Sequence, residues 1–251
     1  MKKLILKNLI QTGVAIVFLF VVWWIAYLSV GNELLIPPLS ESLKEMGGLL
    51  VKSAFWRALG GTLLRALIAF CISFLLAVFF AVIAYLLPCF ERFFAPIVSV
   101  LRSMPILAVL LILLSFLDAG KAPIAVAFLS LFPMLYVGVL AALSGVDKHL
   151  IEVSRVYGTP VWRKVAAVYL PLSSPYILKE GAAALSFSLK LIVSAEVLSF
   201  TVKSLGGMMQ DAKLYAEIPQ LFALVAVTFV VGLVLETAMG LLASMAEKKV
   251  R

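Results

Sequence analysis

The stretch ALIAFCISFLLAVFFAVIAYLLPCF, from Ala66 to Phe90, contains no charged side chain. A helix needs about 20 apolar residues to cross the hydrocarbon core of a bilayer, so this stretch is long enough to cross it. The whole chain of 251 residues has the same character, with 64% hydrophobic residues, 14% charged residues and a mean hydropathy of +1.14. Soluble domains are roughly half apolar and about a quarter charged. The sequence therefore predicts an integral membrane protein with one domain, residues 1–251.

Apolar runs of similar length lie on both sides of this stretch. They predict an all-α, polytopic protein in which six helices span the membrane, at about residues 12–30, 62–87, 97–117, 122–143, 177–200 and 219–243. The third predicted span contains Met104-Pro105 near its start, and a proline inside a helix removes a backbone hydrogen bond and produces a kink. Six spans place both termini on the same side of the membrane.

The lysines and arginines predict which side that is, because cytoplasmic segments carry an excess of them. With a cytoplasmic N-terminus, eleven lie in inside segments: Lys2, Lys3, Lys7, Arg92, Lys148, Arg155, Arg163, Lys164, Lys248, Lys249 and Arg251. Six lie in outside segments: Lys44, Lys52, Arg57, Lys121, Lys203 and Lys213. We therefore predict an N-in, C-in topology. This topology explains the net charge of +8, so we expect membrane lipids and no nucleic acid as partners.

On this topology the segment 147–176 is a cytoplasmic loop that contains EVSRVYGTPVWRKVAAVYLP, from Glu152 to Pro171. Apolar and charged residues alternate at helical spacing on both sides of Gly158, which predicts two short amphipathic helices separated by a turn. Leu170-Pro171 is expected to close the second helix. Amphipathicity alone also fits a loop that lies on the lipid headgroups.

The spacing within this segment resembles the EAA loop of ATP-binding-cassette importer permeases. That loop has a Glu, two small residues, a Gly, nine further residues and then Ile-x-Leu-Pro. Glu152, Gly158 and Leu170-Pro171 stand in register here, although Val153 and Val168 replace the usual Ala and Ile. The resemblance implies that the loop couples the permease to a separate ATPase, through Glu152, Ser154, Arg155, Gly158, Leu170 and Pro171.

Further motifs are similar to permeases of nitrate, taurine, aliphatic sulfonate, bicarbonate and thiamine-precursor importers. They are IPPLSES at Ile36–Ser42, LRSMPILAVLLIL at Leu101–Leu113, LFPM at Leu131–Met134, SAEVL at Ser194–Leu198 and SLGGMM at Ser204–Met209. The resemblance implies the type I importer permease fold in the bacterial cytoplasmic (inner) membrane. The implied partners are two ATPase subunits, a second permease copy or a sister permease, and an extracytoplasmic substrate-binding protein.

Ionisable side chains inside spans are costly, so they usually face a cavity or a partner. Lys190 lies about 20 Å into the fifth predicted span and is a candidate for the translocation pathway, where it would attract an anionic or polar solute. It can equally pair with a neighbouring helix or a second subunit. We assign Glu196, together with Met104 and Pro105, to the pathway or its gate. Arg65 and Arg102 are interpreted as mainly topological.

Several kinds of chemistry have no candidate residues in the sequence. DAGKAP at Asp118–Pro123 contains Gly-Lys, but Ser115 and Ala122 stand where a P-loop needs Gly and Ser or Thr. ATP and Mg²⁺ are therefore expected on the partner ATPase, with no cofactor, metal site or catalytic residue on this chain. Two alternatives stay open: a secondary transporter driven by an ion gradient, and a structural or assembly protein. The expected function is inward transport of a small polar or anionic solute by alternating access.

Overall fold

The structure is a computed structural model that describes residues 18, 21–33, 35–146 and 160–250. Every regular element in these ranges is helical, in agreement with the predicted all-α class. A short apolar helix, Val21–Val30, is followed by α2 (Leu39–Val51), α3 (Ser53–Leu86), α4 (Pro88–Ser103), α5 (Ile106–Leu114) and α6 (Ala122–Ser144). The chain continues with α8 (Val161–Lys164), the π-helical turn η1 (Val165–Tyr169), α9 (Leu170–Ser199), α10 (Leu205–Leu214) and α11 (Ile218–Val250).

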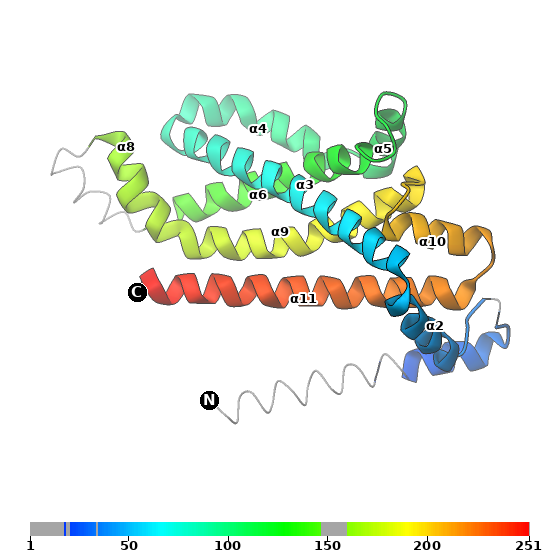
Figure 1. The fold of residues 1–251 in the computed structure, drawn as a ribbon. Helices are drawn as coiled ribbons and strands as arrows, with labels where there is room; N and C mark the ends of the chain where they lie inside the picture. Colours follow the sequence, from blue (N-terminus) through cyan, green and yellow to red (C-terminus); the bar gives the residue numbers. More distant parts are fainter. Residues whose placement is uncertain (1–17, 19–20, 34, 147–159, 251) are drawn as a thin grey trace.

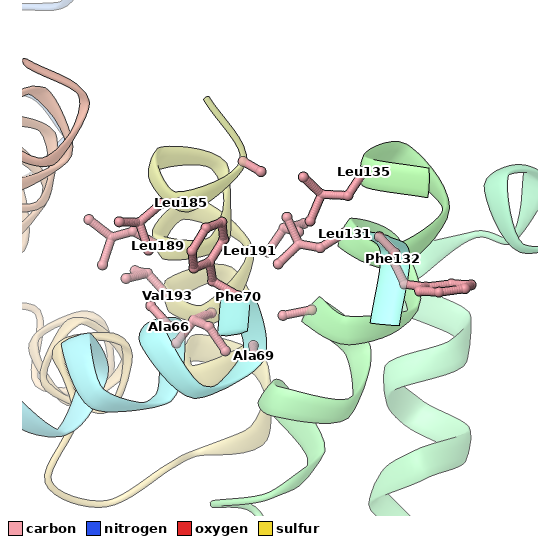
Figure 2. Close-up of a cluster of buried hydrophobic side chains, with 14 of the residues drawn as sticks. Ala66, Ala69, Phe70, Leu131, Phe132, Leu135, Leu185, Leu189, Leu191 and Val193 are labelled. Atoms are coloured by element: carbon pink, nitrogen blue, oxygen red, sulfur yellow. The ribbon is translucent and has the colours of Figure 1, made fainter. Parts of the chain in front are cut away.

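Three long helices, α3, α6 and α9, form the centre of the bundle, and α11 packs along α9 (Figure 1). Figure 2 shows side chains from the three helices converging, among them Phe70 of α3, Leu131 of α6 and Leu189 of α9. The face that α3 turns to its neighbours is made of small residues, of which Ser73, Ala77 and Ala81 are fully buried. Small residues let helix backbones approach closely in a membrane, so these three positions, at four-residue spacing, form a close packing face of α3.

Four helices are long and apolar enough to cross a membrane: Ser53–Leu86, Ala122–Ser144, Val165–Ser199 and Ile218–Leu241. They match four of the six predicted spans. The first predicted span, 12–30, lies largely outside the described residues, and its described part is the apolar helix Val21–Val30. The number of six spans and the N-in, C-in orientation therefore stay predictions.

The predicted span 97–117 is not one straight helix. α4 ends at Ser103, α5 begins at Ile106, and the two helices meet at 88°. Pro105 has no N–H to donate and forces the residue before it out of the helical region, and Met104 is accordingly extended, with φ −67° and ψ 130°. The kink was predicted at the right residues, but it separates two helices and does not merely bend one.

Leu170-Pro171 does not end a helix, contrary to the prediction that it would close the second amphipathic helix. α8, η1 and α9 follow one another without a gap from Val161 to Ser199, through Pro171 and Pro175. The π-helical turn lies directly before Pro171, and the Leu170 N–H there donates to Val165 O, five residues back. A π turn supplies the extra room that a proline ring needs on the preceding turn, so the helix passes over the proline.

Candidate functional site

Glu196 lies in the last turn of α9, at a point where the chain reverses direction. Phe200 ends the helix in the left-handed region, with φ 53°. Ser204 then caps α10 by accepting a hydrogen bond from the Gly207 N–H at 2.8 Å. A serine at this position satisfies one of the free amides at a helix start. The turn brings the beginning of α10 back against the end of α9.

The Glu196 carboxylate is completely buried, and both of its oxygens accept hydrogen bonds. Its Oε1 accepts a hydrogen bond from Arg65 Nη1 at 2.9 Å, in an ion pair in which the Arg65 side chain is 19% exposed. Its Oε2 accepts from Thr62 Oγ1 at 2.8 Å and from the Gly206 N–H at 3.3 Å. We call Glu196, Arg65, Thr62, Leu205 and Gly206 the Glu196 cluster. It joins α3, α9 and α10 at one end of the bundle.

The expectation that Arg65 is mainly topological is wrong. Its partner lies 131 residues away in sequence, on a helix that no local pattern places beside α3. An arginine inside an apolar run does signal a carboxylate partner, because an unpaired charge there is costly. That signal was available in the sequence, but it did not say which of the carboxylates would be the partner. Nothing in the sequence indicated that Thr62 and Gly206 would donate hydrogen bonds to Glu196.

Glycines let the three helices of the cluster approach one another. A Cβ atom on Gly206 would lie 2.6 Å from Val197 N and 2.7 Å from Val193 O, which are both backbone atoms of α9. A Cβ atom on Gly61 would lie 2.6 Å from the Lys203 carbonyl oxygen. Backbone atoms cannot move aside as a flexible side chain can, so these glycines are required by packing. The Thr62 hydroxyl also accepts from the Leu205 N–H at 2.9 Å across this contact.

The adjacent glycines of α3 provide a matched pair of substitutions. We expect Gly61→Ala to lower the free energy of unfolding by about 1–3 kcal/mol, because the new methyl group meets the Lys203 carbonyl. Gly60→Ala should raise it by about 0.4–1 kcal/mol, because a Cβ there has nothing within 4 Å and alanine favours the helix. Thermal unfolding of both variants in the same detergent measures the difference. Equal effects of the two substitutions would contradict the close approach at Gly61.

The loop between α5 and α6 is fastened to the same end of α9. Thr201 Oγ1 donates to the Ala119 carbonyl at 2.6 Å and lies 2.7 Å from Ser199 Oγ. Within the loop, Lys121 Nζ lies 2.9 Å from Asp118 Oδ2, and the hydrogen bond from the Lys121 side chain lowers the pKa of the Asp118 carboxyl. These contacts fasten the loop between α5 and α6 to the end of α9 that carries the Glu196 cluster.

Lys190 lies in a different setting. It opens onto a groove between α9, α10 and α11 with a volume of about 330 Å³, which we call the α9–α11 groove. Its polar lining also contains Glu236 of α11 together with Ser186, Ser194 and Thr228. Apolar side chains form the remaining walls: Val193, Met209, Val225, Phe229 and Leu233. A groove of this size suits a small solute.

Arg102 borders a second cavity, of about 470 Å³, between α4 and α6. The same cavity is lined by Glu91 and Tyr136, and the buried Tyr136 hydroxyl has no hydrogen-bond partner among the described residues. Arg102 is exposed, as are Met104 and Pro105 nearby.

The predicted site residues therefore fall into separate places. Lys190 lies in the α9–α11 groove, Glu196 in the buried cluster, and Met104-Pro105 at the junction of α4 and α5. Leu170 and Pro171 are partly buried positions within the helix that runs on into α9. The other coupling residues, Glu152, Ser154, Arg155 and Gly158, lie outside the described residues. Glu236, which shares the groove with Lys190, was not among the predicted site residues.

Comparison with known proteins identifies the kind of protein that has this arrangement. Residues 73–251 match the family described as binding-protein-dependent transport system inner membrane component. The chain belongs to this family. It is thus a multi-pass permease of ATP-binding-cassette importers, as the resemblance of the sequence motifs predicted.

Two curated relatives are sulfonate permeases by name. The taurine transport system permease protein TauC of Escherichia coli (strain K12) is 24% identical over 233 residues, which cover 90% of this chain and 84% of that protein. The putative aliphatic sulfonates transport permease protein SsuC of Bacillus subtilis (strain 168) is 29% identical over 154 residues, 61% of this chain and 55% of that protein.

The fold is also found among solved importers. A bacterial alginate ABC transporter, crystallised with a periplasmic protein that holds an alginate pentasaccharide, has a chain that aligns with a TM-score of 0.66 and 16% identity. The alignment covers 90% of this chain and 91% of that one. At this identity the likeness shows the fold alone, and it places the helices described above in the architecture of an ABC importer permease.

Proposed function

We propose that this permease moves a small polar or anionic solute, of the sulfonate class, into the cell by alternating access driven by ATP hydrolysis on a separate subunit. The observation that carries the proposal is the family match over residues 73–251, which includes the whole segment from Glu152 to Pro171. The named substrates of the relatives TauC and SsuC favour a sulfonate. Lys190, a cation in the α9–α11 groove, suits such an anion.

The helix from Val161 to Ser199 supports a coupling role for the segment before it. Because α8, η1 and α9 follow one another without a gap, a displacement at Val161 can reach Lys190 and Glu196 along one continuous, bent helix (Figure 1). In the proposed N-in, C-in topology with six spans, two ATPase subunits contact the segments around Glu152–Gly158 from the cytoplasm. When the ATPases bind ATP and close, they move the helix from Val161 to Ser199 in each of the two permeases. The spans then rock between inward-open and outward-open states.

A second permease, either another copy or a sister chain, is proposed to cover one face of α9. The residues on this face recur at steps of three and four and are exposed in the single chain: Tyr176, Lys179, Ala183, Phe187, Lys190, Ser194 and Leu198. A membrane-embedded helix face that includes a lysine needs a partner or a water-filled path beside it, since lipid cannot solvate the charge. Two such faces opposite one another enclose a pathway.

Transport driven by an ion gradient is the alternative of a different class. It needs a carboxylate that can exchange a proton or sodium ion inside the membrane. Glu196 is already held by Arg65, Thr62 and Gly206, so it is not available for that exchange. This hydrogen bonding of Glu196 favours the ATP-driven proposal over the gradient-driven alternative.

The proposal is tested by isolating the chain from its native membrane in a gentle detergent and identifying co-purifying proteins by mass spectrometry. We expect an ATP-binding-cassette ATPase that hydrolyses ATP in the presence of Mg²⁺, and a substrate-binding protein. The binding protein can then be screened with sulfonates to identify the solute. Recovery of the intact, folded chain without any ATPase would overturn the proposal and favour the gradient-driven alternative.

A further inference from the structure

The α9–α11 groove carries both signs of charge. Lys190 enters it from α9 and Glu236 from α11, and the two helices lie side by side along their length (Figure 1). The residues around the two charges are otherwise apolar or hydroxylated. Both charged side chains are exposed at the groove, so a solute that enters it can reach them.

Neither charge is neutralised by an ion pair within the described residues. The ion pairs found there are Arg65–Glu196 and Lys121–Asp118, so Lys190 and Glu236 are more than 4 Å from each other and from other opposite charges. Glu236 makes a long contact, in which Ser186 Oγ donates to its Oε2 at 3.5 Å. Unpaired charges at membrane depth are costly unless they serve a ligand or line an aqueous path.

The separation of the charges sets the length of a ligand that can reach both. Ser186, which contacts Glu236, lies one helical turn before Lys190 on α9. One turn of an α-helix rises about 5.4 Å. The two charges therefore enter the groove at neighbouring turns of α9, more than 4 Å apart, so a small ligand with opposite charges at its two ends can reach both.

We propose that the α9–α11 groove binds a small zwitterion, with its sulfonate or carboxylate at Lys190 and its ammonium at Glu236. A simple anion would satisfy Lys190 but leave the Glu236 carboxylate unbalanced in the same groove, where it would repel the ligand. Phe229 forms part of the wall, and an aromatic ring face adds attraction for an ammonium group. This inference rests on the proposed function and narrows its solute from an anion to a zwitterion.

Taurine and isethionate separate these possibilities, because both are two-carbon sulfonates and only taurine carries an ammonium group. The measurement is equilibrium binding of radiolabelled taurine to the permease–ATPase complex in lipid nanodiscs without binding protein, with competition by unlabelled isethionate. We expect the wild type to bind taurine at least roughly tenfold more tightly than isethionate, the effect of one charge-assisted hydrogen bond. Equal affinities, or no binding of taurine, would overturn the inference.

Two substitutions show which residue binds the ammonium end of the ligand and which binds its sulfonate end. Glu236→Gln should weaken taurine binding roughly tenfold and leave isethionate unaffected, whereas Lys190→Met should weaken both by roughly tenfold. The double exchange of Lys190→Glu with Glu236→Lys should restore part of the taurine affinity, because the zwitterion can bind in the reverse direction. If Glu236→Gln weakens both ligands equally, the ammonium is not recognised there and the inference is wrong.

Glu180→Gln is the matched control, since it removes a carboxylate from the same helix at a different cavity. This variant should bind taurine as the wild type does. The experiment also distinguishes failure of the zwitterion site from failure of the proposed function. A complex that retains its ATPase but does not discriminate taurine from isethionate contradicts only the zwitterion site. Absence of an ATPase partner contradicts the proposed function itself.

Discussion

Replacing Glu196 by alanine should lower the free energy of unfolding by about 3–5 kcal/mol, because it leaves the Arg65 guanidinium beside the buried end of α9 without its counter-charge. The same substitution removes the acceptor for the Thr62 hydroxyl and the Gly206 N–H. Buried donors without acceptors add to the cost. The measurement is thermal unfolding, or unfolding by a denaturing detergent, of the purified protein.

The double variant Arg65→Met/Glu196→Gln tests whether the unpaired charge causes the loss of stability in Glu196→Ala. It removes both charges, and glutamine can still accept from Thr62 and Gly206, so it should lose much less stability than Glu196→Ala. Glu217→Ala is the control for loss of a carboxylate at an exposed position and should change stability by no more than about 0.5 kcal/mol. If Glu196→Ala unfolds at the wild-type temperature, the ion pair does not hold α3 and α9 together.

Charge reversal at Glu152 is expected to have the largest effect on activity. Glu152→Lys, and likewise Gly158→Val, should reduce transport-coupled ATP hydrolysis and uptake by roughly 5–150-fold, the range of a coupling free energy of about 1–3 kcal/mol between two sites. The reason is that both residues stand in register with the EAA loop, to which the resemblance assigns coupling to the ATPase. Coupled hydrolysis in the reconstituted complex and uptake in cells measure the effect.

Membrane insertion and stability of these two variants should remain at the wild-type level, since the spans are unchanged. Lys148→Gln removes a charge from the same predicted loop outside the matching pattern, and coupling should survive it. Full uptake by Glu152→Lys would count against the coupling role. Loss of uptake with complete loss of the ATPase from the complex would assign the residue to assembly and not to signalling.

Local sequence patterns predicted a structural feature correctly where the physical cause of that feature is local. The uncharged runs predicted the long helices, and Met104-Pro105 predicted a kink where the structure has a break. Leu170-Pro171 failed as a helix stop, because a proline signal is local but the π turn that accommodates it depends on the whole helix. The coupling residues were predicted only through a family pattern, and four of them, Glu152, Ser154, Arg155 and Gly158, lie outside the described residues.

By itself the sequence determined that this is a helical membrane protein and, through its motifs, that it belongs to the importer permeases, because bilayer crossing and chain turns depend on residues close together in the chain. Only the tertiary structure decided which charges meet. Arg65 reaches Glu196 across 131 residues, and Lys190 shares a groove with Glu236 of another helix. Such pairs depend on how helices pack and rotate against one another, which a single helical pattern does not fix.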